Sequence, residues 1–287
     1  MIELPDGFVR NTVAREGERG SAWLATLPGL VDELLQRWNR KPTGSVRYGF
    51  VGIVVPVLPT AVLKVSYPHP GNVHEPDAFA AWGGNGAVLL HERDDAHFAM
   101  LLERASDTSL AEIDAEEAVG IAGELSRRLA IPAPAHLPRL CDLVVDWERE
   151  LKETAGLPRR AAEAALANLR ELGPGQPDLL VHGDLHVANV LRAQREPWLV
   201  IDPKGYLGDP AYDTMTALSF GTLLGEPDLK AALLRRIAIF AEAAGLDRDR
   251  AHKWTQARAV IASAWGRRHG DPDWLIEIHD RIAEHLD

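Results

Sequence analysis

The residues best suited to chemistry lie in one polar loop and at the end of the apolar run that follows it. The loop contains Asp184 and Asn189, and Asp202 comes thirteen residues after Asn189. Transfer of a phosphoryl group to a hydroxyl needs a carboxylate that orients the hydroxyl and accepts its proton. It also needs a second carboxylate and an amide oxygen that hold Mg²⁺ against the nucleotide phosphates. Asp184 suits the first role, and Asn189 and Asp202 suit the second.

A metal-dependent hydrolase is the alternative interpretation of the same loop. His182, Asp184 and His186 alternate along the chain, so on a strand they would face one side and could bind Zn²⁺. Gly183 suits a loop better than a regular strand, and the hydrolase interpretation leaves Asp202 without a role. We therefore expect His182 to be a scaffold group that hydrogen-bonds to the backbone and fixes the loop.

The loop also has the spacing of a kinase catalytic loop, in which four residues separate the aspartate from the asparagine. With its flanking segments, the chain resembles the aminoglycoside phosphotransferase family of antibiotic kinases. Within that family it is most similar to the streptomycin 6-phosphotransferase and hydroxyurea phosphotransferase group. The resemblance extends over nearly the whole sequence. It rests on residues 61–64 (AVLK), 81–88 (AWGGNGAV), 101–104 (LLER), 181–191 (VHGDLHVANVL) and 208–213 (GDPAYD).

The resemblance implies that ATP, as its Mg²⁺ complex, is the phosphoryl donor and that Lys64 holds the α- and β-phosphates. A lysine in the middle of an apolar strand needs an anionic partner, because an unpaired buried ammonium is costly. Besides the phosphates, the resemblance offers Glu75 as this partner, and Asp77 is the alternative. Proline is tolerated at the first position of a helix, so Pro76 predicts a helix that has Glu75 at its cap.

Two further segments are implied to surround the nucleotide. Gly49 and Gly52 lie in the place of the nucleotide-covering loop, although the full G-x-G-x-x-G pattern is absent. Leu102, Glu103 and Arg104 lie in the linker between the lobes, where backbone groups would hydrogen-bond to the adenine edge.

Acidic residues near the C-terminus are the candidates for binding the acceptor. The chain has 31 Lys and Arg against 42 Asp and Glu, a formal charge of −11, which is compatible with a cationic small molecule. The resemblance implies a pocket lined by carboxylates, and we select Asp271, Asp273 and Glu277, because carboxylates suit the guanidinium groups of streptomycin. A solvated acidic helix face is the simpler interpretation. Streptomycin is the first choice of acceptor, and the alternatives are another aminoglycoside, hydroxyurea, or a metabolite such as a sugar or amino alcohol.

The elements that must position these residues divide the chain in two. Strand-like patterns up to residue 104 lie at 46–58, 61–65, 87–90 and 97–102, with one short helix at 76–82. Helical patterns then lie at 115–130, 143–154, 161–172, from a cap at Asp228 to 244, 248–267 and 273–286, with strand-like patches at 179–181 and 198–201.

Together with the resemblance, these patterns predict an α+β, protein-kinase-like fold of two lobes. Residues 1–102 would form an N-terminal nucleotide-binding lobe with a small antiparallel sheet and one helix. Residues 103–287 would form a larger, mainly helical C-terminal lobe with the catalytic loop and the acceptor site. Asp209 and Asp213 are expected to cap the helix that follows, with Asp209 also bracing the catalytic loop. Trp254 and Trp265 are expected in the helical core.

Composition and charge exclude several classes of function. With 46% hydrophobic and 25% charged residues, the chain is an ordinary globular one, and its acidity disfavours nonspecific binding to nucleic acid or anionic membranes. The single cysteine, Cys141, excludes an intramolecular disulfide and fits a reducing compartment. Residues 1–11 lack the pattern of a signal peptide, and no apolar stretch is long enough to span a bilayer. We therefore expect a cytoplasmic protein whose partner is a small acceptor.

Overall fold

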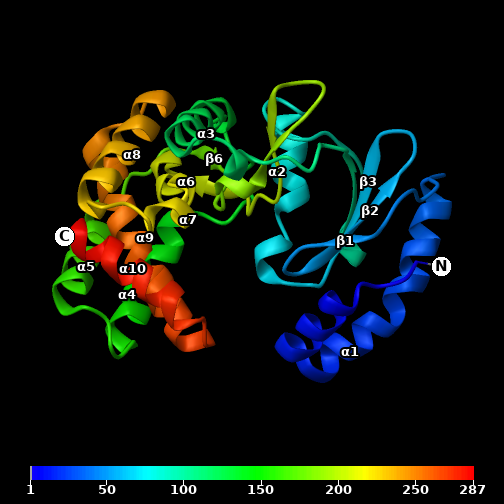
Figure 1. Ribbon diagram of the computed structural model, residues 1–287, viewed down its shortest axis with the longest axis horizontal. Helices are drawn as coiled ribbons and strands as arrows, with labels where there is room; N and C mark the ends of the chain where they lie inside the picture. The colour runs from blue at the N-terminus through cyan, green and yellow to red at the C-terminus, as the bar shows by residue number, and fades with distance from the viewer. Residues whose placement is uncertain (1) are drawn as a thin grey trace. The chain divides into compact units, whose positions relative to one another are not determined.

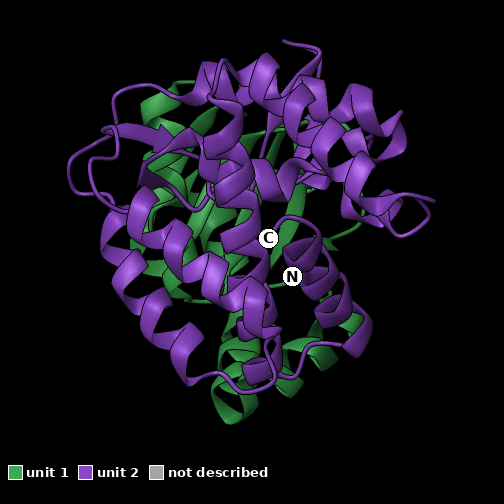
Figure 2. Cartoon of the chain, turned by 90° about the vertical axis from the view of Figure 1, so that its left-hand side faces the viewer, with its two compact units in different colours: residues 1–106 green, residues 107–287 purple. Residues whose placement is uncertain are grey.

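The computed structural model describes residues 2–287, which form two compact units (Figure 2). Unit 1 extends to Ser106, and unit 2 runs from Asp107 to Asp287. The boundary lies four residues beyond residue 102, where we expect the N-terminal lobe to end. Within residues 2–287, no helix has both the length and the apolar character needed to cross a membrane.

Unit 1 is built around a five-stranded antiparallel sheet in the order β1–β2–β3–β5–β4 (Figure 1). The strands are β1 (Arg47–Tyr48), β2 (Gly52–Val57), β3 (Ala61–Ser66), β4 (Leu90–Asp94) and β5 (Ala99–Glu103). In β3, Lys64 pairs with residues of both neighbouring strands, so it lies at the centre of the sheet. Because side chains alternate along a strand, Lys64 and Ser66 share one face, and Leu63 and Val65 lie on the other.

One predicted strand is displaced. The sequence predicts a strand at residues 87–90, whereas β4 begins at Leu90 and continues through His91, Glu92 and Arg93. The apolar residues Ala87 and Val88 are buried but lie before the strand. β4 is the last strand in the sheet order, and charged side chains are common on such an edge. Hydrophobicity therefore located the buried residues of this region and not its strand.

A long helix, α1 (Asp6–Arg37), corrects the expectation of one helix in the N-terminal lobe. Several glycines and Pro28 weaken its helical signal, and the helix is interrupted at Gly17, where φ is 59°. The residues that identify it are buried and lie three or four positions apart: Leu24, Leu27, Val31 and Leu34. They form one core with apolar residues of β2, β3 and β5, so α1 covers the sheet face that carries Leu63.

The second helix of unit 1 is α2 (Glu75–Trp82), which ends at Gly83, whose φ is 56°. It lies on the sheet face opposite α1, because its first residue contacts Lys64 on that face. Two short 3₁₀ helices, η1 (Pro70–Asn72) and η2 (Asp95–His97), complete the unit. The helix predicted at 76–82 is therefore present and begins one residue earlier.

Unit 2 is mainly helical (Figure 1). Its helices are α3 (Ala115–Leu129), α4 (Leu140–Glu153), α5 (Arg159–Leu172), α6 (Thr214–Ala217), α7 (Phe220–Leu223), α8 (Leu229–Ala244), α9 (Arg248–His269) and α10 (Asp273–His285), with η3 (Leu110–Glu112) near its start. All six helices predicted here are confirmed, and the short α6 and α7 are additional. Helix α9 is central: it contacts α4, α5, α6, α8 and α10, and its Trp254 is fully buried.

Two short antiparallel strand pairs position the loops that carry the candidate catalytic residues. β6 (Leu179–Val181) pairs with β9 (Tyr206–Gly208), and β7 (Val190–Arg192) pairs with β8 (Trp198–Val200). Residues 182–189, ending in η4 (Val187–Asn189), connect β6 to β7, and residues 201–205 connect β8 to β9. A last 3₁₀ helix, η5 (Pro210–Asp213), follows β9. Both loops therefore leave one small strand pair and enter the other.

Candidate active site

The loop that carries Asp184 is fixed by a buried histidine. His182 is 1% exposed; its Nε2 donates to the carbonyl of Ile201 at 3.0 Å, and its Nδ1 accepts the N–H of Asp184 at 3.2 Å. Burial lowers the pKa of His182 to about 4, so the ring is neutral at pH 7. Both ring nitrogens bind the backbone, as expected for a scaffold group. Neither is left to ligate Zn²⁺, which removes the hydrolase alternative.

A buried carboxylate, Asp213, binds the backbone of the same loop. Its Oδ2 accepts the N–H of His182 at 3.1 Å, and its Oδ1 accepts the N–H of Gly183 at 2.8 Å. Burial raises the pKa of Asp213 to about 7. The expectation that Asp209 braces the loop is wrong: Asp209 caps η5 and accepts the Nε1–H of Trp254 at 2.6 Å. Both aspartates follow β9, and only the folded backbone shows which one reaches the loop.

Arg258 connects α9 to this loop. Its guanidinium donates to the carbonyl of Tyr212 at 2.7 Å and to the carbonyl of Gly183 at 3.3 Å, and it lies 3.7 Å from the centre of the Tyr212 ring. Gly183 has a φ of 85°, and a Cβ atom there would lie 2.6 Å from a ring carbon of Tyr206. This position therefore requires glycine, both for its backbone conformation and for its close packing.

Asn189 and Asp202 lie on segments that a backbone hydrogen bond joins, from the N–H of Ile201 to the carbonyl of Asn189 at 2.9 Å. Asn189 is 7% exposed, and its Nδ2 donates to the carbonyl of Asp184 at 3.0 Å, which leaves its Oδ1 to act as an acceptor. Asp202 has a φ of 58°, which is uncommon for a residue other than glycine. Carboxylate and amide oxygens are ligands that Mg²⁺ prefers, so both residues fit a magnesium site.

Asp184 itself is partly accessible, with 31% of its side chain exposed. The ammonium of Lys204 lies 3.9 Å from its Oδ2. Sequence reasoning missed Lys204, although a cation two residues after Asp202 was a visible signal. The loop thus combines a fixed backbone with a carboxylate that a substrate could reach.

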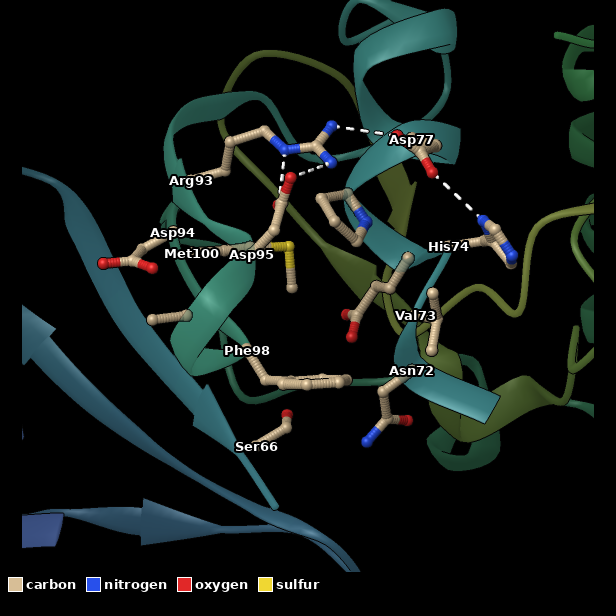
Figure 3. Close-up of a pocket in the computed structure, with 13 residues that line it drawn as sticks. Ser66, Asn72, Val73, His74, Asp77, Arg93, Asp94, Asp95, Phe98 and Met100 are labelled. Carbon is tan, nitrogen blue, oxygen red and sulfur yellow. Dashed lines mark hydrogen bonds and ion pairs between the residues drawn. The ribbon is translucent and has the colours of Figure 1, made fainter. Parts of the chain in front are cut away.

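In unit 1, Lys64 pairs with Glu75. Its Nζ donates to the Oε1 of Glu75 at 2.6 Å, and the two side chains are 10% and 3% exposed. Glu75 is the first residue of α2, preceded by His74 at the cap position, so the expectation that Glu75 is the cap is wrong by one residue. The alternative partner, Asp77, instead binds Nδ1 of His74 at 3.1 Å and Arg93 at 3.0 Å (Figure 3).

A cavity of about 190 Å³ lies beside this ion pair, between α2 and strands β3 and β5 (Figure 3). Apolar groups of Val73, Phe98 and Met100 line it, together with Ser66, whose buried Oγ has no hydrogen-bond partner among the described residues. Glu75 is the only residue of the expected nucleotide site among the residues that line it. The cavity therefore adjoins the predicted nucleotide site at Glu75 and shares no other lining residue with it.

The glycines of the expected covering loop differ from each other. Gly52 begins β2, and a Cβ atom there would lie 2.7 Å from the carbonyl of Val65, so close strand pairing alone requires this glycine. Gly49 has open space around its Cα, and its N–H donates to the carbonyl of Gly52 at 2.9 Å. The pair therefore closes the turn between β1 and β2.

The expected adenine-binding linker is the end of β5. Leu102 is buried in the sheet, and Glu103 both donates its N–H to the carbonyl of Leu89 at 2.8 Å and accepts the N–H of Leu89 at 3.0 Å. The N–H of Arg104 donates to the carbonyl of Thr60 at 3.0 Å. The N–H groups of Glu103 and Arg104 are thus used within unit 1, so a donor to adenine would have to come from a neighbouring residue.

The acidic residues selected for the acceptor lie around the start of α10. Asp273 and Glu277 are exposed, and Asp271 is half-buried in the turn before the helix, where its N–H donates to the carbonyl of Gly266 at 2.9 Å. Asp280, on the same helix face, instead binds Arg267 at 2.6 Å. The opposite face packs on the unit through Ile278, Ile282 and Leu286.

The two tryptophans of α9 have different environments. Trp254 is fully buried, as expected, whereas Trp265 is 45% exposed and stacks on His269 with ring centres 4.2 Å apart. The expectation that Trp265 lies in the core is therefore wrong. Trp274, at the start of α10, is also exposed.

Comparisons with known proteins identify the family and the fold of the chain. Residues 37–270 match the profile of the aminoglycoside/hydroxyurea antibiotic resistance kinase family. The chain is 35% identical over 284 residues to streptomycin 6-kinase of Streptomyces glaucescens and 37% identical over 289 residues to that of Streptomyces griseus. Each alignment covers 94% of this chain and 92% of the relative. Among solved structures, choline kinase LicA of Streptococcus pneumoniae superposes with a TM-score of 0.63 at 12% identity, covering 91% of this chain and 98% of LicA.

The fold is thus protein-kinase-like, as the sequence predicts. The chain belongs to the aminoglycoside/hydroxyurea antibiotic resistance kinase family.

Proposed function

We propose that the protein transfers the γ-phosphoryl group of ATP to a hydroxyl group of streptomycin. The observation that carries the proposal is the loop of Asp184, which His182 and Asp213 fix through its backbone and which a hydrogen bond joins to the segment of Asp202. Two relatives named streptomycin 6-kinase, at 35% and 37% identity over nearly the whole chain, support the choice of acceptor.

Each candidate residue then has one task. Asp184 orients the acceptor hydroxyl and accepts its proton. Asn189 and Asp202 hold Mg²⁺, which when bound neutralises charge on the nucleotide phosphates. Lys64, aligned by its hydrogen bond to Glu75, binds the α- and β-phosphates. Most of the rate enhancement comes from positioning and from the arranged charges, and proton transfer adds to it.

Unit 1 supplies the remaining nucleotide contacts. Gly49 and Gly52 form the turn that covers the phosphates, and the backbone of residues 102–104 lies along the adenine. We add Ala105 to this segment, because its N–H makes no hydrogen bond within residues 2–287 and is left to donate to a ligand. Ala105 is thus the donor to the adenine ring, in place of Glu103 and Arg104.

Unit 2 supplies the acceptor site. Asp271, Asp273 and Glu277 bind the cationic groups of streptomycin, whose guanidinium groups pair well with carboxylates. Asp273 and Glu277 are exposed, so such a ligand can reach their side chains. Asp280 does not bind the acceptor, because its carboxylate already accepts a hydrogen bond from Arg267.

The test is ADP release by the purified protein with ATP and Mg²⁺ across a panel of acceptors: streptomycin, other aminoglycosides, hydroxyurea, and common sugars and amino alcohols. We expect turnover with streptomycin that greatly exceeds the rate without acceptor. Turnover with another member of the panel instead would keep the phosphotransferase and overturn its acceptor. ATP binding without turnover on any acceptor would contradict the proposed reaction.

A further inference from the structure

We infer that Lys204 is a further catalytic residue, whose ammonium binds the transferring phosphoryl group beside Asp184. This inference rests on the proposed function, since it assigns a role within the same reaction. Lys204 lies two residues after the proposed magnesium ligand Asp202, on the loop that connects β8 to β9.

The backbone of Lys204 is fixed to the catalytic loop. Its N–H donates to the carbonyl of His182 at 2.7 Å, and the N–H of Gly205 donates to the same carbonyl at 3.4 Å. The Cβ of Lys204 packs so close to Gly183 that a Cβ on that glycine would lie 2.9 Å away. The first part of the side chain therefore runs over Gly183 toward Asp184.

The ammonium of Lys204 is close to Asp184 but is not hydrogen-bonded to it. Its Nζ lies 3.9 Å from Oδ2, which is beyond hydrogen-bond distance, and its side chain is 30% exposed. Within the described part of the chain, this ammonium donates no hydrogen bond to any other residue. Its three donors are thus available to an anion that approaches Asp184.

The incoming phosphoryl group requires such a cation. Asp184 must lie next to the attacking hydroxyl, and its negative charge repels the phosphoryl oxygens that the hydroxyl approaches. Arg258 cannot supply the charge in the same way, because it donates to the carbonyls of Tyr212 and Gly183. Lys204 is the cation that the structure places in an ion pair with Asp184.

In the step itself, the acceptor oxygen forms a bond to the γ-phosphorus, and the bond from that phosphorus to the β,γ-bridging oxygen breaks. The electron pair of the broken bond leaves on ADP, and the hydroxyl proton moves to Asp184. Lys204 keeps its proton throughout. Its positive charge stabilises the phosphoryl oxygens between the attacking and leaving groups, where the transition state spreads its negative charge.

The first test replaces the ammonium by an apolar group of similar length. Lys204→Met should lower kcat with streptomycin by about 100-fold. Removing one hydrogen-bond donor that stabilises a developing negative charge in other enzymes has an effect of this size. The Kd for ATP measured without acceptor should change less than about threefold. Lys204 is proposed to stabilise the transition state of transfer, whereas this Kd reports only the binding of ATP in the ground state. Lys204→Arg should restore most of the rate. Lys230→Met, on the exposed surface of α8, is the matched control and should behave as the wild type.

The second test separates direct contact from an effect through Asp184. In an Asp184→Asn background, Lys204→Met should still lower the residual rate at least about tenfold, because the phosphoryl group is still there to be stabilised. A loss of rate seen only when Asp184 is intact would show that Lys204 merely positions Asp184. Unchanged kcat for Lys204→Met would overturn the inference outright.

These outcomes differ from failure of the proposed function. If the wild-type protein does not phosphorylate streptomycin, the proposed acceptor fails, and the comparison is repeated on the hydrolysis of ATP with water as acceptor. If the wild type turns over and Lys204→Met does so equally well, only the assignment of Lys204 fails.

Discussion

Two groups of carboxylates in unit 2 are held in opposite ways. Asp184 lies on a loop whose backbone binds buried His182 and Asp213, so its position is set by side chains that solvent does not reach. Asp273 and Glu277 project from the first turns of α10 into solvent, and no hydrogen bond in the described chain holds either side chain.

This difference follows from what each group has to do. A base must be held within about 0.5 Å of the position from which it can accept the proton, which requires a rigid support. Recognition of a cation tolerates movement, because attraction between charges falls gradually with distance. We therefore expect substitutions on the loop to change kcat, and substitutions on α10 to change the KM for the acceptor.

The largest expected effect comes from Asp184→Asn, which keeps the size of the side chain and removes its ability to accept a proton. We expect kcat to fall by about 1000-fold, within the range of general-base contributions. The Kd for ATP, measured by titration calorimetry with Mg²⁺, should stay close to the wild-type value. Loss of ATP binding would instead make Asp184 a ligand for the metal or a structural residue.

The next effect comes from Asp213→Asn. The two carboxylate oxygens of Asp213 each accept a backbone N–H of the loop, and the substitution replaces one of these oxygens by an NH₂ donor. An unsatisfied buried N–H costs about 2 kcal/mol, or about 30-fold if the cost falls on kcat. Steady-state kinetics at saturating streptomycin would measure it. Asp247→Asn, at the cap of α9, is the control, because it also alters a backbone-binding aspartate but lies outside the loop. Equal kcat values for the two variants would show that the loop does not depend on Asp213.

A smaller effect is expected on α10. The double variant Asp273→Asn, Glu277→Gln should raise the KM for streptomycin about tenfold, which is about 1.4 kcal/mol. The KM for ATP and kcat should hardly change. Glu284→Gln is the matched control, since Glu284 is an exposed carboxylate further along the same helix. An unchanged KM for streptomycin would make this face a solvated surface and move the acceptor site elsewhere.

The smallest effect concerns the pH dependence of stability. Burial lowers the pKa of His279 on α10 to about 4, below its value of 6.5 in an unfolded chain. Between these values the unfolded chain binds the proton and the folded chain does not, so stability is lost as the pH falls from 6.5 toward 4. From pH 6.5 to 5.5 the wild type should lose about 1 kcal/mol more than His279→Gln in urea unfolding. If the free energy of unfolding changes equally with pH in the wild type and in His279→Gln, the buried, neutral state of His279 is contradicted.

Much of the fold was predictable from the sequence because its helices have clear signals. Helices α3 and α8 begin directly after Asp114 and Asp228, whose side chains cap them, and both starts agree with the predicted ranges. Helix α1 was missed because glycine and Pro28 weaken its propensity, whereas its stability comes from an apolar face that packs on the sheet. Strand β4 was displaced because an edge strand can be charged.

The candidate site was predictable only where its residues act through their own chemistry. Asp184, Asn189 and Asp202 carry groups whose type and spacing indicate phosphoryl transfer, and the family resemblance adds Lys64. Asp213 and Arg258 act by binding the backbone, and this depends on which loops the fold brings together. Lys204 could have been noticed beside Asp202, but only the structure shows that its ammonium lies next to Asp184.

The most direct test of the central claim is the mass spectrum of streptomycin after incubation with the protein, ATP and Mg²⁺, compared with the same reaction by Asp184→Asn. We predict that the wild type adds one phosphate to streptomycin and that the variant adds almost none in the same time. Unmodified streptomycin from the wild type, or equal phosphorylation by both proteins, would contradict transfer by the loop of Asp184.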